Sequence, residues 1–382
     1  MKILLSTSLF PTPDDPALLS DADALGEFVS EWTKAGHEVT VLHAYLEDEK
    51  GAKKLLQLLP SIRYQKQTTL FGATVHRVII RCMKSKPVLR EKMMARAARI
   101  FNDKIGPQDV YLAHFPVITR GLPENICAGV PPIGVMHTTD NQLIRDKIGF
   151  CPDGIPVLAF RSNRIRSDYE KTGRFCDSSF IIYSGAPQVQ PHAAAYREET
   201  FKILYAGKLI RRKQPDLLLR ACAALPSDIP WKLTIAGAGE MEGMLKDMIR
   251  SMGLESRVEM TGPLSHEKTL EKMGETDVFS LPSYGETFGL TYLEAMSRGA
   301  LAIGSRGEGI DGVMVDGENG YLLDAKDEAG LTRLLEKLWR QDETEWMRVV
   351  NGGVRTAENM GRSQAAQTYL DNAIKALEEI RA

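Results

Sequence analysis

Short apolar runs that alternate with longer helical patterns constrain this chain more than any other feature of its sequence. Ile, Val and Leu dominate these runs, and the segments between them have the spacing of amphipathic helices. The first series consists of Ile3–Leu5, Val39–Leu42, Val75–Ile80, Val110–Ala113, Pro132–Met136, Val157–Phe160 and Phe180–Ile182. Strands that alternate with helices are typical of repeated βαβ units, so the pattern predicts an α/β fold with a parallel sheet.

A second series of apolar runs follows a polar, helix-poor stretch from Ser184 to Thr200. Its members are Lys202–Tyr205, Lys232–Ala236, Val258–Met260, Val278–Leu281, Leu301–Ile303 and Tyr321–Leu323. A chain of 382 residues is too long for one compact core and suits two domains. We therefore predict an N-terminal domain over residues 1–190, a C-terminal domain over 191–361, and a long amphipathic surface helix from Gln364 to Ile380.

Charge and cysteine content limit the classes of partner and compartment. The formal net charge is -2, which gives no general attraction to nucleic acid. The cysteines are scattered without a CxxC spacing, which predicts reduced thiols, at positions Cys82, Cys127, Cys151, Cys176 and Cys222. The apolar N-terminal run is too short for a secretory signal, and no apolar stretch approaches the roughly 18 residues of a membrane span. We expect a cytoplasmic protein.

The segment from Val278 to Ile303 forms one βαβ unit and predicts an anion site. A strand over 278–281 leads through a turn to a helix over about 289–298, and Gly299 suits a left-handed helix C-cap. A helix N-terminus presents backbone N–H groups that no carbonyl of the helix can satisfy. The groups expected to face the anion are those of Phe288, Gly289 and Leu290, with Thr287 beside them.

Two carboxylates flank this anion site. Glu286 lies in the loop before the helix, and Glu294 is expected roughly two turns inside it. A diphosphate at the helix terminus would leave a ribose on one side and a sugar on the other, and both offer hydroxyl donors to carboxylates. We assign Glu294 to the ribose and Glu286 to the sugar. The alternative is that both are solvated surface glutamates.

Residues 282–296 read PSYGETFGLTYLEAM and resemble the E-x7-E signature of the family-4 retaining GT-B glycosyltransferases. The resemblance implies two Rossmann-like, doubly wound domains facing a cleft, with the helix at 362–382 packed back on the first domain. It also implies transfer of a hexose from a nucleotide sugar, UDP-linked first and GDP-mannose second. The acceptor would be a saccharide or a lipid-linked molecule, in polysaccharide or glycolipid synthesis.

Further motifs between residues 202 and 323 carry the same resemblance. Residues 205–213, YAGKLIRRK, are similar to the element whose two cations hold the donor diphosphate, although the family has arginine where this chain has Lys208. The resemblance implies that the donor contacts Gly207, Lys208, Lys213, Gly239, Gly262 and Pro263. Charge on the departing diphosphate would be stabilised by Lys208, Lys213 and the helix N-terminus, so no metal cofactor is expected.

In the first domain, His137 follows the strand Pro132–Met136 at its carboxyl end, where open α/β sheets bind ligands. In the family a histidine at a matching place contacts the transferred sugar. We therefore name His137, Glu286 and Lys213 as catalytic candidates and Asp140 as a weaker one. Asp21-Ala22-Asp23 matches a metal-binding DxD motif only formally, because it is expected at the start of a helix.

The segment from Arg77 to Lys104 contains nine Lys or Arg residues against Glu91 and Asp103, and it has apolar residues at helical spacing. One interpretation is a surface helix that packs its apolar face on the core. The other is a basic amphipathic helix at the inner membrane face, with peripheral membrane contact through residues 77–104.

Other function classes remain open. A nucleotide-sugar epimerase or a phosphorylase of similar architecture, a two-carboxylate glycosidase, and a non-catalytic nucleotide-sugar binding protein share parts of the pattern. A Rossmann dehydrogenase has less support, because Gly237-x-Gly239 has no third glycine at the expected offset.

Overall fold

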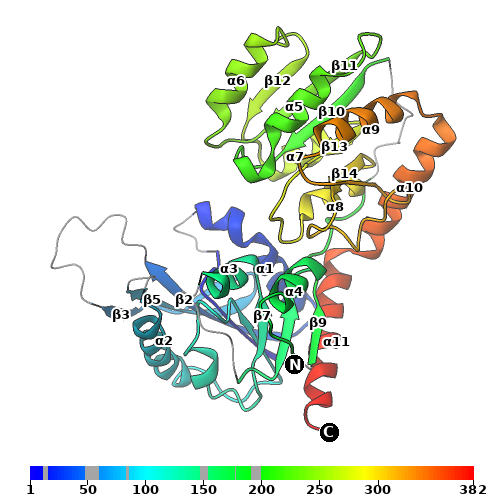
Figure 1. The fold of residues 1–382 in the computed structure, drawn as a ribbon. Coiled ribbons are helices and arrows are strands. Elements are labelled where there is room, and N and C mark those ends of the chain that lie inside the picture. Colours follow the sequence, from blue (N-terminus) through cyan, green and yellow to red (C-terminus); the bar gives the residue numbers. More distant parts are fainter. Residues whose placement is uncertain (12–15, 48–59, 83–85, 147–153, 177, 191–198) are drawn as a thin grey trace. The chain divides into compact units, whose positions relative to one another are not determined.

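The computed structural model describes residues 1–11, 16–47, 60–82, 86–146, 154–176, 178–190 and 199–382. The chain forms two compact units (Figure 1): one comprises Met1–Tyr183 with Arg362–Ala382, and the other comprises Ser184–Gly361. The second unit begins where the polar stretch begins, a few residues before the predicted boundary at 190. Among the predicted thiols, Cys151 lies outside the described residues.

The first unit is built on a mainly parallel sheet in the order β3-β5-β2-β1-β6-β7-β8-β9. Its strands are β1 (Lys2–Thr7), β2 (Glu38–Glu47), β3 (Ser61–Tyr64), β4 (Thr68–Leu70), β5 (Ala73–Arg81), β6 (Val110–His114), β7 (Ile133–Met136), β8 (Val157–Phe160) and β9 (Ser178–Ile181). All seven predicted strands are present. The apolar pattern does not predict β3 and β4, because these strands are short, largely exposed and antiparallel to β5 and therefore lack a continuous apolar run.

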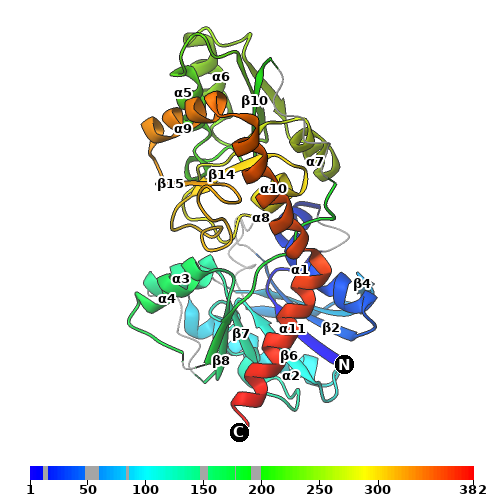
Figure 2. The ribbon, with the colours of Figure 1, turned by 90° about the vertical axis from the view of Figure 1, so that its right-hand side faces the viewer.

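The helices of the first unit are α1 (Pro16–Lys34), α2 (Pro87–Asn102), α3 (Thr138–Arg145), α4 (Asn163–Glu170), the 3-10 helix η3 (Pro123–Asn125) and the C-terminal α11 (Arg362–Glu379). Figure 2 shows α11 lying along α1. The ring of Trp32 in α1 lies 5.5 Å from that of Tyr369, and its indole N–H donates to the carbonyl of Ala366 at 2.9 Å. Because α1 begins at Pro16, Asp21 and Asp23 lie inside it, which corrects their expected place at a helix start.

The packing of helix α2 bears on the two interpretations of the basic segment at 77–104. Its apolar face lies in the core of the first unit, with Met93, Met94 and Phe101 buried against strands and loops. Residues 77–81 belong to β5, and Met83–Ser85 lie outside the described residues. An interfacial helix needs an exposed apolar face, so the packing interpretation has the structural support. In the described ranges, no helix has the length and apolar character needed to cross a bilayer.

The second unit contains a wholly parallel sheet in the order β12-β11-β10-β13-β14-β15. The strands are β10 (Phe201–Ala206), β11 (Trp231–Ala236), β12 (Val258–Gly262), β13 (Val278–Ser280), β14 (Leu301–Ser305) and β15 (Tyr321–Leu323), and they match all six predicted runs. The chain moves outward from β10 to β12 and then returns to the other side of β10 at β13. This reversal is the switch point at which doubly wound sheets bind ligands.

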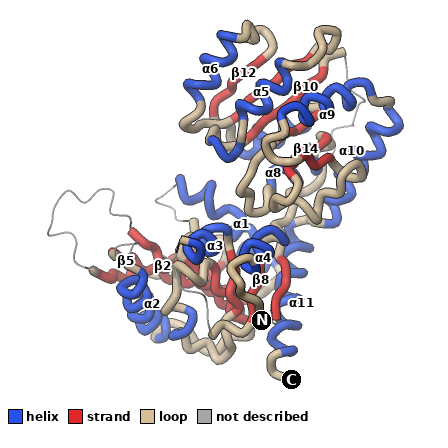
Figure 3. The backbone as a smooth tube through the Cα atoms, viewed as in Figure 1, coloured by secondary structure: helices blue, strands red, loops and turns tan. Residues whose placement is uncertain are grey.

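Helices cover both faces of this second sheet (Figure 3). They are η4 (Arg211–Lys213), α5 (Pro215–Ala223), α6 (Glu242–Ser251), α7 (His266–Gly274), α8 (Leu290–Ser297), α9 (Glu328–Arg340) and α10 (Glu343–Asn359). Helix α5 packs against α9, while α8 packs against α7 and α10. Because β10 and β13 run parallel to each other, the loops that follow them emerge at the same edge of the sheet.

The contact between Trp32 and α11 should be measurable as stability of the first unit. We expect Trp32→Ala to lower its free energy of unfolding by about 3–5 kcal/mol, because the variant loses buried aromatic area and leaves a cavity. The measurement is urea denaturation with probes specific to each unit. Trp346, which is equally buried in the second unit, provides the matched control. Trp346→Ala should leave the transition of the first unit in place, and equal effects of both variants on that transition would contradict the prediction.

Candidate functional site

The predicted donor-site residues of the second unit gather at the carboxyl edge of its sheet. Gly207, Lys208 and Lys213 follow β10, and Gly239 follows β11. Gly262 ends β12 with Pro263 after it, and the segment from Glu286 to Gly289 joins β13 to α8, where Leu290 and Glu294 lie. His137 lies in the first unit, at the carboxyl end of β7.

Glu286 and Lys213 form a buried ion pair between the loops after β13 and β10. Glu286 is only 8% exposed, and its Oε2 accepts hydrogen bonds from the Lys213 ammonium and, at 3.3 Å, from the hydroxyl of Ser283. The guanidinium of Arg212 lies 3.9 Å from the same oxygen. Burial acts to raise the pKa of the Glu286 carboxyl, but the charges of Lys213 and Arg212 and these hydrogen bonds hold it below its ordinary value. Glu286 is therefore a carboxylate.

Backbone contacts fix the loop that carries Glu286. Its own N–H donates to the carboxylate of Glu308 at 2.8 Å. Two residues earlier, the N–H of Tyr284 donates to the carbonyl of Arg212 at 2.8 Å, which ties this loop to η4. Arg212 belongs to the YAGKLIRRK element, where it or Arg211 is expected to help hold the diphosphate, whereas Ser283 and Glu308 are not predicted as site residues. Glu308 lies in the glycine-rich stretch GEGIDG at residues 307–312, after β14, and this position is the sequence signal that could have located it.

Helix α8 begins at Leu290, one residue later than expected. Gly289 is its N-cap in the left-handed conformation, with φ 86°, which glycine adopts without steric cost. The N–H groups at this end have no carbonyl acceptor within the helix, and the helix dipole favours negative charge there. The start of α8 suits an anion, next to the Glu286 carboxylate and its cations. Thr287 and Phe288 precede the cap, and the ring of Phe288 is buried.

Glu294 is the fifth residue of α8, so it lies about one turn inside the helix and not two. It is 8% exposed, so the alternative of a solvated surface glutamate does not hold. Its Oε1 lies 3.7 Å from Nδ1 of His266, the first residue of α7. A buried carboxylate near the sheet edge suits hydroxyl donors of a ligand. Its assignment to a ribose stays a prediction.

The turn after β11 is held close to the loop after β10 by backbone contacts. Gly207 donates its N–H to the carbonyl of Ala236 at 3.0 Å, and a Cβ at Gly239 would lie 2.3 Å from the carbonyl oxygen of Leu209. Glycine at 239 is therefore required by the packing of two loops. Lys208 is exposed beside them, and the carbonyl of Gly262 accepts from Gly237 at 2.9 Å.

In the first unit, the half-buried His137 belongs to a chain of polar groups that continues through the fully buried His114 and Tyr369. Its Nε2 lies 3.1 Å from Nδ1 of His114, and the hydroxyl of Tyr369 lies 3.1 Å from Nε2 of His114. The ring of Phe115 stacks on His137 at 3.8 Å, with Phe115 held at φ 57°. Burial, with a contribution from Arg161, lowers the pKa of both histidines well below the ordinary value, so both rings are neutral.

Asp140 has a structural function that its sequence position did not reveal. Its carboxyl accepts the backbone N–H groups of His137 at 2.9 Å and of Val117 at 3.1 Å, which fixes the start of α3 and the loop after β6. Burial raises its pKa to about 7, and these backbone donors oppose the rise. The described part of the chain contains no group of three or more His, Cys, Asp or Glu residues that could hold a metal ion.

Residues 190–351, within the second unit, match the family model described as "Glycosyl transferases group 1". This match confirms the resemblance that the motifs predict over that region. A D-inositol 3-phosphate glycosyltransferase of Arthrobacter sp. (strain FB24) is 34% identical over 149 residues, which cover 38% of this chain and 35% of the relative. That of Thermomonospora curvata is 25% identical over 236 residues, which cover 59% of this chain and 51% of the relative. The chain thus spans about a third to a half of the length of these curated relatives.

Solved structures cover both units. The apo form of the lipopolysaccharide outer core galactosyltransferase WaaB superposes with a TM-score of 0.68 over 98% of this chain and 99% of that chain, at 16% identity. Anabaena HepE in complex with UDP-glucose gives a TM-score of 0.62 over 97% of this chain and 98% of that chain, at 15% identity. The fold is that of GT-B glycosyltransferases, with a parallel sheet in each unit, as predicted.

The buried ion pair predicts a specific pattern of stability. We expect Lys213→Met to lower the free energy of unfolding of the second unit by about 3–5 kcal/mol, because it leaves the Glu286 charge buried without its main partner. Adding Glu286→Gln should recover part of this loss. The exposed pair of Lys246 and Glu242 is the control, since Lys246→Met should change stability by less than about 1 kcal/mol in the same urea titration. Additive effects of Lys213→Met and Glu286→Gln would contradict the coupling.

The lowered pKa values of His114 and His137 predict how the stability of the first unit depends on pH. Their pKa values are lower in the folded than in the unfolded chain, so their contribution is complete above pH ~6.5 and is lost at lower pH. The loss approaches ~1.4 kcal/mol per pH unit for each histidine. Asp140 acts in the opposite direction. Its pKa is raised to about 7 in the folded state, so the folded chain takes up this proton at a higher pH than the unfolded chain does, and the carboxyl favours folding as the pH falls. Urea titrations between pH 5 and 8 give the free energy of unfolding of the first unit at each pH. Compared with the unchanged chain, its dependence on pH should be shallower for His114→Asn and steeper for Asp140→Asn, and unchanged slopes would refute this assignment.

Proposed function

We propose that this chain is a retaining glycosyltransferase that moves a hexose from a nucleotide sugar to a saccharide or lipid-linked acceptor without a metal ion. The match of residues 190–351 to the glycosyl transferases group 1 family supports the class of enzyme. The single observation that carries the proposal is the buried pair of Lys213 and Glu286 at the switch point of the second sheet. It holds a cation and a carboxylate beside a helix start that suits an anion.

The donor would bind along the carboxyl edge of the second sheet. Its diphosphate would meet Lys208, Lys213 and the first N–H groups of α8, while Glu294 would accept from the ribose and Glu286 from the hexose. The turns at Gly239 and at Gly262 and Pro263 would line the nucleoside. A UDP-linked hexose is the first choice, supported by the UDP-glucose complex of HepE, and GDP-mannose is the second.

The lysine ammonium has three N–H donors, so Lys213 can keep its bond to Glu286 and also donate to a phosphate oxygen. In the transfer step the bond from the anomeric carbon to the diphosphate oxygen breaks, and a bond to the acceptor oxygen forms on the same face. The acceptor proton passes to the leaving diphosphate, whose growing charge is stabilised by the cations and the α8 dipole. Fixed charges of this kind allow departure without a metal.

His137 of the first unit is proposed to contact the transferred sugar. Its Nε2 is bonded to His114, and Phe115 packs on its face, so its ring is held in one orientation. Since both histidines are neutral, His137 would act as a hydrogen-bonding group. The lipid-linked acceptor, the peripheral membrane contact through 77–104 and the cytoplasmic location stay predictions.

The test of this function is Glu286→Gln, which preserves side-chain volume and removes the carboxylate. We expect transfer from the preferred UDP-hexose to fall by at least about 100-fold, because interactions aimed at the reacting sugar contribute on this scale. UDP binding, measured by calorimetry, should change little because the phosphate contacts remain. Glu259, an exposed glutamate in β12, provides the control, and Glu259→Gln should leave transfer unchanged.

Several outcomes would overturn the proposal. Unimpaired transfer by Glu286→Gln would remove the role assigned to that carboxylate. Conversion of the donor sugar when no acceptor is present would indicate an epimerase. Activity on a free glycoside without nucleotide would indicate a glycosidase, and nucleotide binding without turnover of any nucleotide sugar would indicate a binding protein.

A further inference from the structure

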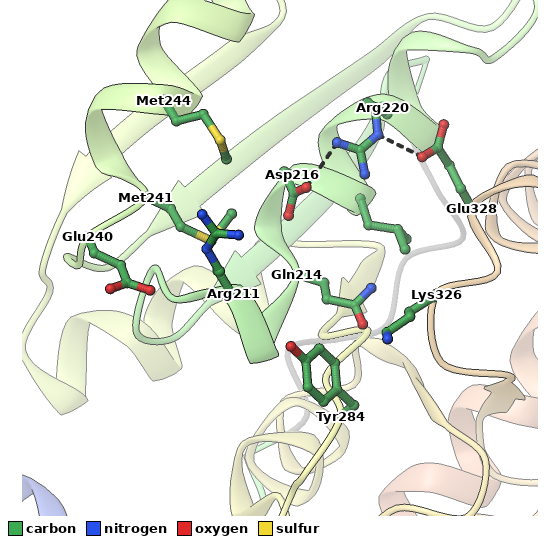
Figure 4. Close-up of a pocket in the computed structure, with 11 residues that line it drawn as sticks. Arg211, Gln214, Asp216, Arg220, Glu240, Met241, Met244, Tyr284, Lys326 and Glu328 are labelled. Carbon is green, nitrogen blue, oxygen red and sulfur yellow. Dashed lines mark hydrogen bonds and ion pairs between the residues drawn. The ribbon is translucent and has the colours of Figure 1, made fainter.

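A cavity of about 670 Å³ lies in the second unit (Figure 4). Its walls come from η4 and the start of α5, the start of α6, the loop after β13 and the loop after β15. Its lining includes Arg211, Gln214, Glu240, Tyr284 and Lys326. The volume falls in the range of small-molecule sites. Lys213 and Glu286 are not among the lining residues, although each is close in sequence to one.

The charges around this cavity balance one another. Arg220 donates to Asp216 at 2.9 Å and to Glu328 at 2.6 Å, and Figure 4 shows these three side chains engaged at one end of the cavity. On the remaining wall, the exposed cations Arg211 and Lys326 stand with the exposed carboxylate of Glu240. Three cations thus face three carboxylates. A strongly charged ligand would meet as much repulsion as attraction here, so the cavity favours a neutral ligand with many hydrogen-bonding groups.

Gln214 gives independent evidence that a polar ligand belongs here. The residue is 6% exposed, and its carbonyl oxygen Oε1 is buried yet accepts no hydrogen bond from the described part of the chain. Figure 4 shows its carboxamide directed towards Tyr284 and Lys326. Buried polar atoms are almost always satisfied, and an exception indicates a missing partner or a functional use. A ligand hydroxyl would supply the missing donor.

The backbone adds a further sign of use at this place. Gln214 has φ 49° and Lys326 has φ 72°, and both lie in the left-handed region that non-glycine residues seldom adopt. Such strain persists where the surroundings impose it, and it is concentrated at ligand sites. The ammonium of Lys326 lies 5.1 Å from the centre of the Tyr284 ring, which joins the loops after β15 and β13 across the cavity.

We propose that this cavity is a saccharide-binding site, separate from the donor residues, that takes a neutral oligosaccharide. Carboxylate, guanidinium and carboxamide groups accept from and donate to sugar hydroxyls, and the balanced charge gives no preference for a phosphate. The site is built on the two loops that also carry the Lys213 and Glu286 pair. Gln214 directly follows Lys213, and Tyr284 lies two residues before Glu286. A bound saccharide therefore orders the segments that place both donor-site residues.

The experiment measures saccharide binding to the full chain in the presence of saturating UDP, so that the nucleotide occupies its own site. Sucrose, maltose, lactose and maltotriose are the neutral probes, and glucose 6-phosphate and inorganic phosphate are the anionic ones. Saturation-transfer NMR detects contact, and calorimetry gives Kd. We expect millimolar binding of at least one neutral probe and weaker binding of both anions.

Two variants locate the binding. Gln214→Gly removes the carboxamide at a backbone position that suits glycine, so the fold should be retained, and Glu240→Gln removes one exposed carboxylate. Each variant should raise the Kd of the neutral probe by at least about 10-fold, which is about 1.4 kcal/mol, while UDP binding stays unchanged. Glu255→Gln, an exposed loop carboxylate outside the cavity, should change neither ligand.

Three results would overturn the proposal: no binding of any neutral probe, tighter binding of an anionic probe, or neutral binding that neither pocket variant weakens. None of them depends on transfer activity. A chain that binds saccharide but not UDP would instead count against the proposed donor site.

Discussion

The ion pair of Lys213 and Glu286 is the interaction on which the candidate site depends. It joins the loop after β10 to the loop after β13, at the place where the strand order of the second sheet reverses. Any parallel doubly wound sheet leaves a gap between its loops at such a reversal. Here a buried charge pair spans the gap, and the carboxylate is kept ionised by its cations in spite of burial. The costs of desolvating both charges are offset only because Ser283 and Arg212 also contact the carboxylate.

The same pair restrains the backbone of both loops. If Glu286 moved away, Lys213 would remain as a buried cation, so both loops must hold their positions together. The contacts of Glu308 with the Glu286 N–H and of Tyr284 with the Arg212 carbonyl restrain the loops from either side. Glycine at 239 then allows the turn after β11 to approach the loop after β10 closely. The geometry of the candidate site is therefore a property of the whole sheet edge.

Much of this architecture could be predicted from the sequence because its strands are buried on both faces. Every predicted run became a strand, whereas β3 and β4 were missed because exposed edge strands carry no continuous apolar signal. The motif around Glu286 located α8 to within one residue. The pairing of Lys213 with Glu286, 73 residues apart, could not be predicted, since both had been assigned to a ligand and not to each other. Nor could the contact of His114 with Tyr369, which lies 255 residues further along the chain.

The left-handed backbone conformation of Gln214 lets one turn contribute side chains to two sites. If residue 214 had ordinary helical dihedral angles, η4 would continue into α5 as one helix through residues 213 and 214. With φ at 49°, the chain instead places the Lys213 ammonium on Glu286 and the Gln214 carboxamide in the neighbouring cavity. The loop after β13 likewise contributes Glu286 to the ion pair and Tyr284 to the cavity. Because each loop contributes one residue to the ion pair and one to the cavity, a ligand that fills the cavity restrains the same two backbones that position the pair.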